Sequence, residues 1–355
     1  MNRLIIAWLL VTGFVIAAAA TPALSQERLW VADQREALAD DIGFYTNAGY
    51  TDFQLIDSAF AEPRDIEFAP DGRLWVLDQR DNLSDDIGRY ADDTYTSFNL
   101  IDSAFADPRD MEFGPDGLLW VLDQRDGLAD DLGRYTDGTY TNFSLISSAF
   151  ADPRDMEFNP FQHLDPNGTI ISAPGALWVL DSRPDLSDEI GYYNNDKTSF
   201  TLIDSAFADP RDLEFGPDGR LWVLDSRDGA ADELGYYDPF FQTFTLIDSF
   251  FNDPQDLEFD QLGRLWVMDR RDGVSDDVGY YSLDFSTFTL IDSFFAMPAD
   301  MEFQIPEPGS LALFGLALAL AASTARVRFT SSHQRLQESI PLSLRNYGVT
   351  LRLTF

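Results

Sequence analysis

Apolar and polar residues recur along most of the chain in one repeated phrase, of which residues 107–127, DPRDMEFGPDGLLWVLDQRDG, are one copy. Tryptophans mark its period, because Trp30, Trp75, Trp120, Trp178, Trp222 and Trp266 are separated by 45, 45, 58, 44 and 44 residues. A period of this length is typical of the blades of a β-propeller. The one long interval comes from an insertion at residues 159–175, whose Pro, Gly and Asn content predicts a loop.

Each repeat contains four short segments with the pattern of strands. In one repeat these segments are residues 74–78, 87–90, 98–102 and 110–113, the last of which precedes the next tryptophan. Pro115-Asp116-Gly117 predicts a tight turn that joins RDMEF and LLWVLD into a hairpin. The LWVLD segments are apolar at consecutive positions, so both faces must be covered, as they are in a blade between two neighbouring blades.

The two ends of the repeat region complement each other. The first unit begins at residues 28–33, RLWVAD, without a preceding PRDxEF segment, and the last ends at residues 298–303, PADMEF, without a following LWVLD segment. A solenoid would need polar capping repeats, whereas joining the last segment to the first removes two open sheet edges. The sequence therefore predicts an all-β, six-bladed propeller over residues 27–304, with four strands per blade and a closure that brings the stretch around Met301 alongside the stretch around Val31. The repeat resembles that of NHL and SMP-30-like six-bladed propellers.

The N-terminal segment differs from the repeats. Residues 1–26 contain Arg3, an apolar stretch at residues 4–16, and small residues before a cleavage position after Ser25. This order predicts a secretory signal peptide with a signal helix, and an uncleaved anchor is the alternative.

A second apolar segment follows the repeats. Pro306, Glu307 and Pro308 precede an uncharged run at residues 309–325, and Arg326 follows it. This run is at the lower limit for a membrane-spanning helix, and the arginine would hold that flank in the cytoplasm. Residues 305–328 resemble a PEP-CTERM sorting signal. The resemblance implies processing by exosortase and export to the envelope or exterior of a Gram-negative bacterium, with a transient membrane anchor at residues 309–325.

Residues 329–355 continue beyond the point where such signals usually finish. Whether the sorting segment is cut, and whether this extension belongs to the mature protein, stay open.

Composition narrows the possible functions. The 355-residue chain has 61 acidic and 24 basic residues, a formal net charge of −37 and no cysteine. The charge disfavours nucleic-acid binding and favours cations or basic proteins. The absence of cysteine excludes disulfides and thiolate chemistry, and only two histidines leave little for a zinc site or a His-based triad. His163 is expected in a surface loop, without a catalytic role.

One set of carboxylates follows each LWVLD segment. In one copy these are Asp123, Asp126, Asp130 and Asp131. Calcium takes six to eight oxygen ligands and accepts backbone carbonyls among them, so such a loop is a candidate calcium site. The alternative is an acidic, solvated surface in which an arginine of the loop, here Arg125, neutralises the acids.

A second set lies in the PRDxEF segments, where an Asp precedes a Glu by two residues and both should face the axial channel. These acids could form a ring that holds a cation, or pair with the preceding arginine across blades. The arginine is replaced by Gln255 and Ala299 in the last two units. That sector should be the most negative, which makes its acids the other candidate calcium ligands: Asp256, Glu258, Asp300 and Glu302.

Two functions remain open. Near-perfect repetition favours a non-enzymatic interaction or scaffold module at the cell surface or in an extracellular polysaccharide matrix, which binds polysaccharide or a surface protein. Catalysis instead requires different roles for different residues, and no catalytic residue stands out. The alternative is a calcium-dependent hydrolase of the lactonase or esterase kind on a six-bladed propeller.

Overall fold

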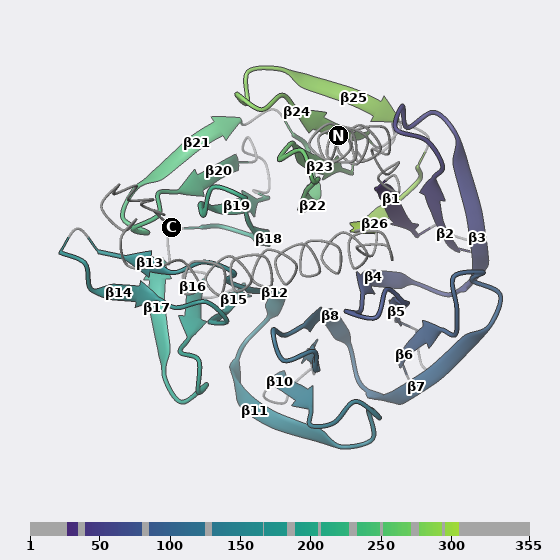
Figure 1. Ribbon diagram of the computed structural model, residues 1–355, viewed down its shortest axis with the longest axis horizontal. Helices are drawn as coiled ribbons and strands as arrows, with labels where there is room; N and C mark the ends of the chain where they lie inside the picture. Colours follow the sequence, from purple (N-terminus) through teal and green to yellow (C-terminus); the bar gives the residue numbers. More distant parts are fainter. Residues whose placement is uncertain are drawn as a thin grey trace, which may run out of the picture. The chain divides into compact units, whose positions relative to one another are not determined.

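The computed structural model describes residues 27–34, 40–79, 85–124, 130–165, 167–182, 189–204, 207–226, 233–248, 251–270, 277–292 and 295–304. These residues form six four-stranded antiparallel sheets arranged as blades around an axis (Figure 1). The predicted all-β, six-bladed propeller is confirmed. The signal segment, the sorting segment and the extension lie outside these ranges. Within them, no helix has the length and apolar character needed to span a bilayer.

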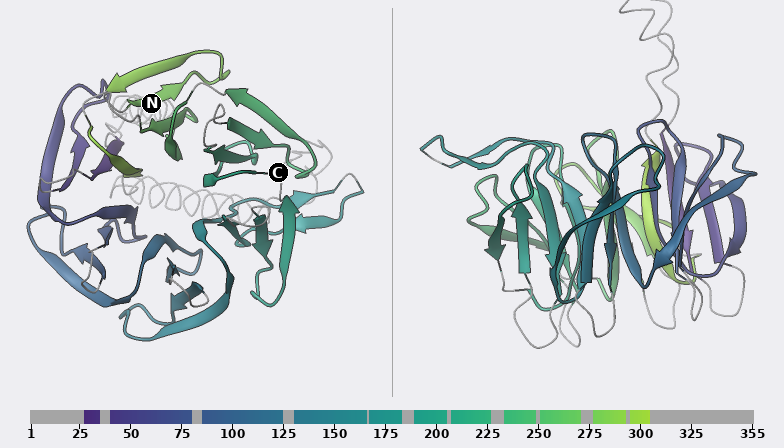
Figure 2. Two further views of the ribbon diagram at one scale, coloured as in Figure 1. Left: turned by 180° about the vertical axis from the view of Figure 1, so that it is seen from behind. Right: turned by 90° about the horizontal axis from the view of Figure 1, so that it is seen from below.

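In every blade the PRDxEF-type segment is the innermost strand, and three more strands follow outward (Figure 1). The first two blades, from inside outward, are β26 (Pro298–Gln304), β1 (Arg28–Asp33), β2 (Asp40–Tyr45), β3 (Phe53–Phe60), and β4 (Pro63–Phe68), β5 (Leu74–Asp78), β6 (Asp85–Tyr90), β7 (Phe98–Phe105). The next two are β8 (Pro108–Phe113), β9 (Leu119–Asp123), β10 (Asp130–Tyr135), β11 (Phe143–Phe150), and β12 (Pro153–Phe158), β15 (Leu177–Asp181), β16 (Glu189–Tyr193), β17 (Phe200–Asp204). The last two are β18 (Pro210–Phe215), β19 (Leu221–Asp225), β20 (Glu233–Tyr237), β21 (Phe244–Asp248), and β22 (Pro254–Phe259), β23 (Leu265–Asp269), β24 (Asp277–Tyr281), β25 (Phe288–Asp292). The strands run between the two faces of the ring (Figure 2).

The ring is closed by the two ends of the repeat region. Strand β1 pairs antiparallel with β26, and the register places Val31 opposite Met301. Strand β26 also lies beside the innermost strands of both neighbouring blades, β22 and β4 (Figure 1). The predicted closure is therefore confirmed, and β26 supplies the first blade with its fourth strand.

A tryptophan in the second strand of each blade fills the interface with the next blade. Trp75 of β5 is buried, and its ring centre lies 5.6 Å from that of Phe113 in the next blade. At the closing interface, Trp266 packs in the same way against Phe303, at 5.4 Å. Burial of these large apolar surfaces drives folding, and edge-to-face ring contacts add to it.

A residue with a left-handed backbone also packs on each of these tryptophans. Six residues that precede the outermost strands have φ between 49° and 56°: Tyr50, Tyr95, Tyr140, Lys197, Phe241 and Phe285. This conformation costs a residue with a side chain about 1–2 kcal/mol. The ring of Tyr50 lies 4.6 Å from that of Trp266, and Nζ of Lys197 lies 5.4 Å from the ring of Trp120. Contact with the indole ring thus offsets the backbone strain.

The insertion at residues 159–175 contains a hairpin, so the prediction of a simple loop is wrong. Strand β13 (His163–Leu164) pairs with β14 (Ile170–Ser172). The expected surface position of His163 is also wrong, because this side chain is only 3% exposed and its ring lies 4.6 Å from that of Phe241. Its Nδ1 lies 3.0 Å from the carbonyl oxygen of Pro239 in the neighbouring blade. Pro and Gly residues signal turns, but they do not reveal that the hairpin packs on another blade.

The close approach of the two outer strands in a blade predicts where a methyl group is not tolerated. A Cβ atom at Gly88 would lie 2.4 Å from Cζ of Phe98 and 2.7 Å from the carbonyl oxygen of Asn99. We expect Gly88→Ala to lower the free energy of unfolding by about 2 kcal/mol, because a ring or strand must move. Gly138→Ala is the control, since a Cβ atom there meets nothing within 4 Å. Equal effects of the two variants in urea denaturation would contradict this explanation.

Candidate functional site

The innermost strands place three kinds of charged side chain along the axis. In β4 these are Arg64, Asp65 and Glu67. Side chains of an extended strand point alternately to opposite faces, but a register shift between Pro63 and Asp65 interrupts this alternation. The side chain of Ile66 is buried between blades. Arg64 and Glu67 are three residues apart, or about 10 Å along an extended strand. The channel therefore has an arginine end, a ring of aspartates and a glutamate end.

The aspartates tie each blade to the next. Oδ2 of Asp65 accepts a hydrogen bond from the backbone N–H of Met111 in the next blade, at 2.7 Å. The same bond recurs from blade to blade, with the acceptor and donor pairs Asp110–Met156, Asp155–Leu213, Asp212–Leu257, Asp256–Met301 and Asp300–Ile66. The last pair completes the ring. Asp256 and Asp300, two of the predicted calcium ligands, thus each use a carboxylate oxygen in a contact between blades.

The arginines do not pair with these aspartates, so the hypothesis of ion pairs across blades is wrong. Nη2 of Arg64 instead contacts Oε1 of Glu62 at 2.9 Å, two residues earlier in the same segment. The other arginines follow the same rule, in the pairs Arg109–Asp107, Arg154–Asp152 and Arg211–Asp209. Each ring aspartate instead accepts the N–H of the next blade.

The six glutamates crowd the opposite end of the channel. Burial raises the pKa of every one of them: Glu67, Glu112, Glu157, Glu214, Glu258 and Glu302. For Glu67 the pKa rises to about 8. Nearby carboxyl groups add to the effect of burial, as Glu302 and Glu214 do for Glu258. Such an environment favours protonated carboxyl groups or a bound cation.

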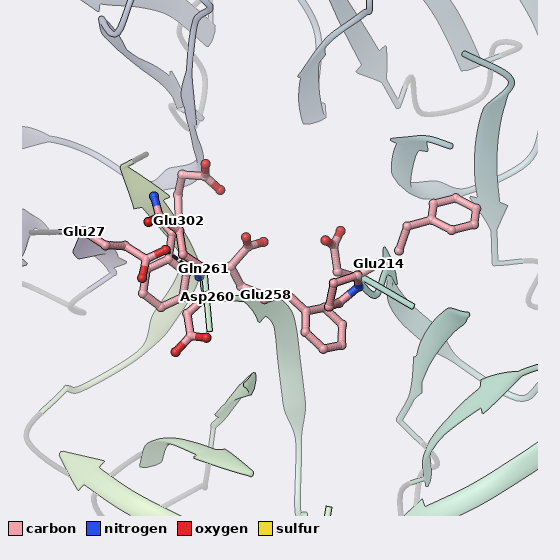
Figure 3. Close-up of a pocket in the computed structure, with 10 residues that line it drawn as sticks. Glu27, Glu214, Glu258, Asp260, Gln261 and Glu302 are labelled. Atoms are coloured by element: carbon pink, nitrogen blue, oxygen red, sulfur yellow. Dashed lines mark hydrogen bonds between the residues drawn. The ribbon is translucent and has the colours of Figure 1, made fainter. Parts of the chain in front are cut away.

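A cavity of about 300 Å³, hereafter the acidic cavity, lies at this end between three blades. Glu214, Glu258 and Glu302 line it, and Figure 3 shows their carboxyl groups pointing into the same space. Glu27 and Gln261 also line the cavity, where Oε1 of Glu27 accepts the N–H of Gln261 at 2.8 Å. The structure thus brings the predicted residues Glu258 and Glu302 together.

Two acidic residues of this cavity, Glu27 and Asp260, are absent from the sequence-based candidates. The carboxylate of Asp260 contacts Nε of Arg264, and its Oδ2 lies 3.2 Å from Nε1 of Trp266. Burial raises the pKa of Glu27. Other repeats hold the uncharged residues Ala, Gly, Asn or Gln at the position of Asp260, so this departure from the repeat was a usable signal. Glu27 precedes the first repeat and could be placed only by the fold.

The predicted calcium ligands are not gathered into one site among the described residues. Oδ1 of Asp123 accepts the N–H groups of Ala106 and Asp107, both at 2.9 Å. Asp126 lies outside the described ranges, as do the side chains of Asp130 and Asp131. Across the ranges that the structure does describe, no three His, Asp or Glu side chains are close enough together to hold a metal ion. Calcium binding therefore stays a prediction for both carboxylate sets.

Comparison with known proteins adds a sorting motif and a fold. Residues 304–328 match the PEP-CTERM protein-sorting motif, which includes the predicted triplet. No curated protein matches the chain.

Three solved structures are similar in fold. A chain of the nidogen/laminin complex has 14% identity and a TM-score of 0.60, over 79% of this chain and 98% of that chain. TolB from Acinetobacter baumannii has 13% identity and a TM-score of 0.62, over 85% and 73%. A putative 6-phosphogluconolactonase from Bacteroides fragilis has 12% identity and a TM-score of 0.52, over 80% and 99%. Identities this low show a shared fold alone.

Proposed function

We propose that this chain, which carries a PEP-CTERM sorting motif and is thus an exported protein, acts as a non-enzymatic interaction or scaffold module. The motif implies processing by exosortase in a Gram-negative bacterium, with the C-terminal segment as a membrane-anchored sorting signal. The proposed place of action is the cell surface or an extracellular polysaccharide matrix, and the proposed partners are polysaccharide or a surface protein.

The repetition of the channel supports this proposal. All six aspartates make the same bond to the next blade, so these acids serve the ring equally. A hydrolase needs a base, an electrophile stabiliser and a leaving-group acid, which are different roles for different residues. Acids that repeat in both position and hydrogen bonding are suited to holding the blades together and to multivalent binding.

One observation favours the alternative, a calcium-dependent hydrolase. The acidic cavity is asymmetric, because Glu27 and Asp260 add carboxylates on one side of the ring only. An asymmetric group of acids is what a metal-dependent hydrolase requires.

The two functions predict different results for the purified full chain supplied with calcium. For the interaction module, we expect no hydrolysis of a panel of lactones and esters above the uncatalysed rate, together with binding on a polysaccharide array. Glu258→Gln, in the acidic cavity, should leave that binding unchanged. The matched control is Glu112→Gln, which changes the equivalent glutamate in a blade that does not line the cavity. Saturable turnover that is lost in Glu258→Gln but retained in Glu112→Gln would overturn the proposal in favour of the hydrolase.

A further inference from the structure

The arginine end of the channel holds a second cavity. Its volume is about 110 Å³, and it is lined by Arg64, Arg109, Arg154, Arg211 and Arg270 together with Gln34, Gln255 and Ala299. This space is hereafter the arginine cavity. Five guanidinium groups meet around one small space, although the formal net charge of the chain is −37. Close guanidinium groups repel one another unless acids or an anion compensate them.

The fifth guanidinium comes from a different position of the repeat. Gln255 stands where four blades have arginine, but the same blade carries Arg270 directly after β23. Other blades hold Gln or Ser at that position, as in Gln79 and Ser226. The prediction that this sector is the most negative one overlooked Arg270, which lines the arginine cavity beside Gln255.

The neighbouring acids compensate these guanidinium groups only in part. A guanidinium has five N–H donors, yet Arg109 contacts its acid Asp107 through Nη2 alone. The Nε atoms of four of the arginines are buried and have no hydrogen-bond acceptor, namely those of Arg64, Arg109, Arg154 and Arg211. None of the four paired acids lines the arginine cavity.

Burial, and after it the charge of Arg64, lowers the pKa of Arg109. Because a guanidinium keeps its proton in proteins, this environment destabilises the cluster rather than neutralising it. An anion between the arginines would relieve that cost.

We propose that the arginine cavity binds a small oxyanion. A cavity of about 110 Å³ holds roughly four water molecules at about 30 Å³ each, which suits one phosphate, sulfate or carboxylate group but excludes a nucleotide. Guanidinium groups match the geometry of such oxyanions and bind them through charge-assisted hydrogen bonds. The ligand is either a free inorganic oxyanion or a carboxylate that projects from a larger molecule. This site is separate from the acidic cavity and does not depend on the function proposed above.

Isothermal titration of the full chain with inorganic phosphate tests the site, with ionic strength held constant by chloride. We expect saturable binding at one site. Arg109→Gln should weaken it by roughly tenfold or more, because one charge-assisted donor group is lost. Arg73→Gln is the matched control, since Arg73 also pairs with an acid two residues earlier, Asp71 at 3.3 Å, but lies at the surface. It should leave the affinity within about twofold.

A gain-of-affinity variant keeps the test decisive even where Arg109→Gln fails to fold. Ala299 lines the arginine cavity, and the residue two positions earlier is Met297 rather than an acid. Ala299→Arg therefore adds a guanidinium without the acid two residues earlier that the arginines at this position in four other blades have, and it should tighten phosphate binding by roughly tenfold.

Competition experiments separate the two ligand sources. Displacement of phosphate by glucuronate but not by glucose would identify a carboxylate on a larger molecule, whereas binding of phosphate and sulfate without such displacement would identify a free inorganic oxyanion. Both outcomes support the site. The proposal is overturned by the absence of saturable binding of all three anions, or by an affinity that neither Arg109→Gln nor Ala299→Arg changes.

Discussion

An Asp65→Ala variant is expected to be about 3 kcal/mol less stable than an Asp65→Asn variant at pH 7. Both remove the same carboxylate, so relief from its burial and from repulsion by Asp300 is common to both. Only asparagine keeps an oxygen for the N–H of Met111, which donates to Oδ2 of Asp65 at 2.7 Å. A buried N–H without an acceptor costs about 1–3 kcal/mol, and the lost side-chain volume adds to this.

Urea denaturation of the two variants measures this difference. Asp93 supplies the control pair, because its side chain is exposed in a turn outside the channel. Asp93→Ala and Asp93→Asn should differ by less than about 0.5 kcal/mol. If Asp65→Ala and Asp65→Asn unfold at the same urea concentration, the aspartates do not hold the blades together.

The architecture could be predicted because it depends on the pattern of apolar residues within each repeat and on the number of copies of each segment. The spacing of tryptophans gives the blade period, and the unmatched segments at the two ends require β26 to join β1. The register depends on the inner strand, where the apolar residues Met301 and Phe303 alternate with Asp300 and Glu302, so a slip of one residue would exchange the two faces.

The roles of charged residues along the axis could not be predicted in the same way. Simple alternation puts Arg64 and Asp65 on opposite faces, whereas the register shift after Pro63 brings both to the channel. The predicted arginine–aspartate pairs assumed an unbroken strand, so they named the wrong partner for the arginine. Arg270 and Glu27 lie outside the inner strands, and only the closed ring brings them to the cavities.

Residues that depart from the repeat were the most informative sequence signal for the residues that line the two cavities. Arg270 replaces Gln or Ser, and it contributes to one of the two cavities. Asp260 replaces Ala, Gly, Asn or Gln, and it lines the other cavity. In a repeat protein, positions that all copies share serve the shared fold, so a residue that breaks the pattern is released from that role.

The free energy of unfolding is expected to fall by several kcal/mol as pH rises from about 4 to 8, because the buried acids of the channel have raised pKa values. Burial raises the folded-state pKa of Asp155, Asp300 and Glu67 to about 6, 7 and 8. The folded protein therefore binds more protons than the unfolded chain in this window. Stability from these groups is fully present below their unfolded pKa, near 4, and is lost as pH rises through the folded values.

Groups with a lowered pKa act in the opposite direction, and His163 and Asp137 are examples. Burial lowers the pKa of His163, so its contribution is lost as pH falls through that lowered value. Hydrogen bonds from Thr139 and Asn142 lower the pKa of Asp137 to about 2, which affects stability only below about pH 4. Because the channel acids outnumber His163, we expect maximum stability near pH 4–5 rather than near neutrality.

Urea denaturation at intervals between pH 4 and 8 tests this expectation, and Glu258→Gln identifies its source. Glu258 is surrounded by Glu302, Glu214 and Asp256, so its neutral amide should raise stability at pH 8 and flatten the profile. Asp93→Asn changes the net charge equally at an exposed position and should leave the slope unchanged. A profile that rises toward pH 8 would contradict this expectation. A profile that the two variants flatten equally would show that the mean negative charge rather than the channel sets the pH dependence. The two explanations can be distinguished because salt screens exposed charges far more strongly than charges that are buried around the axis.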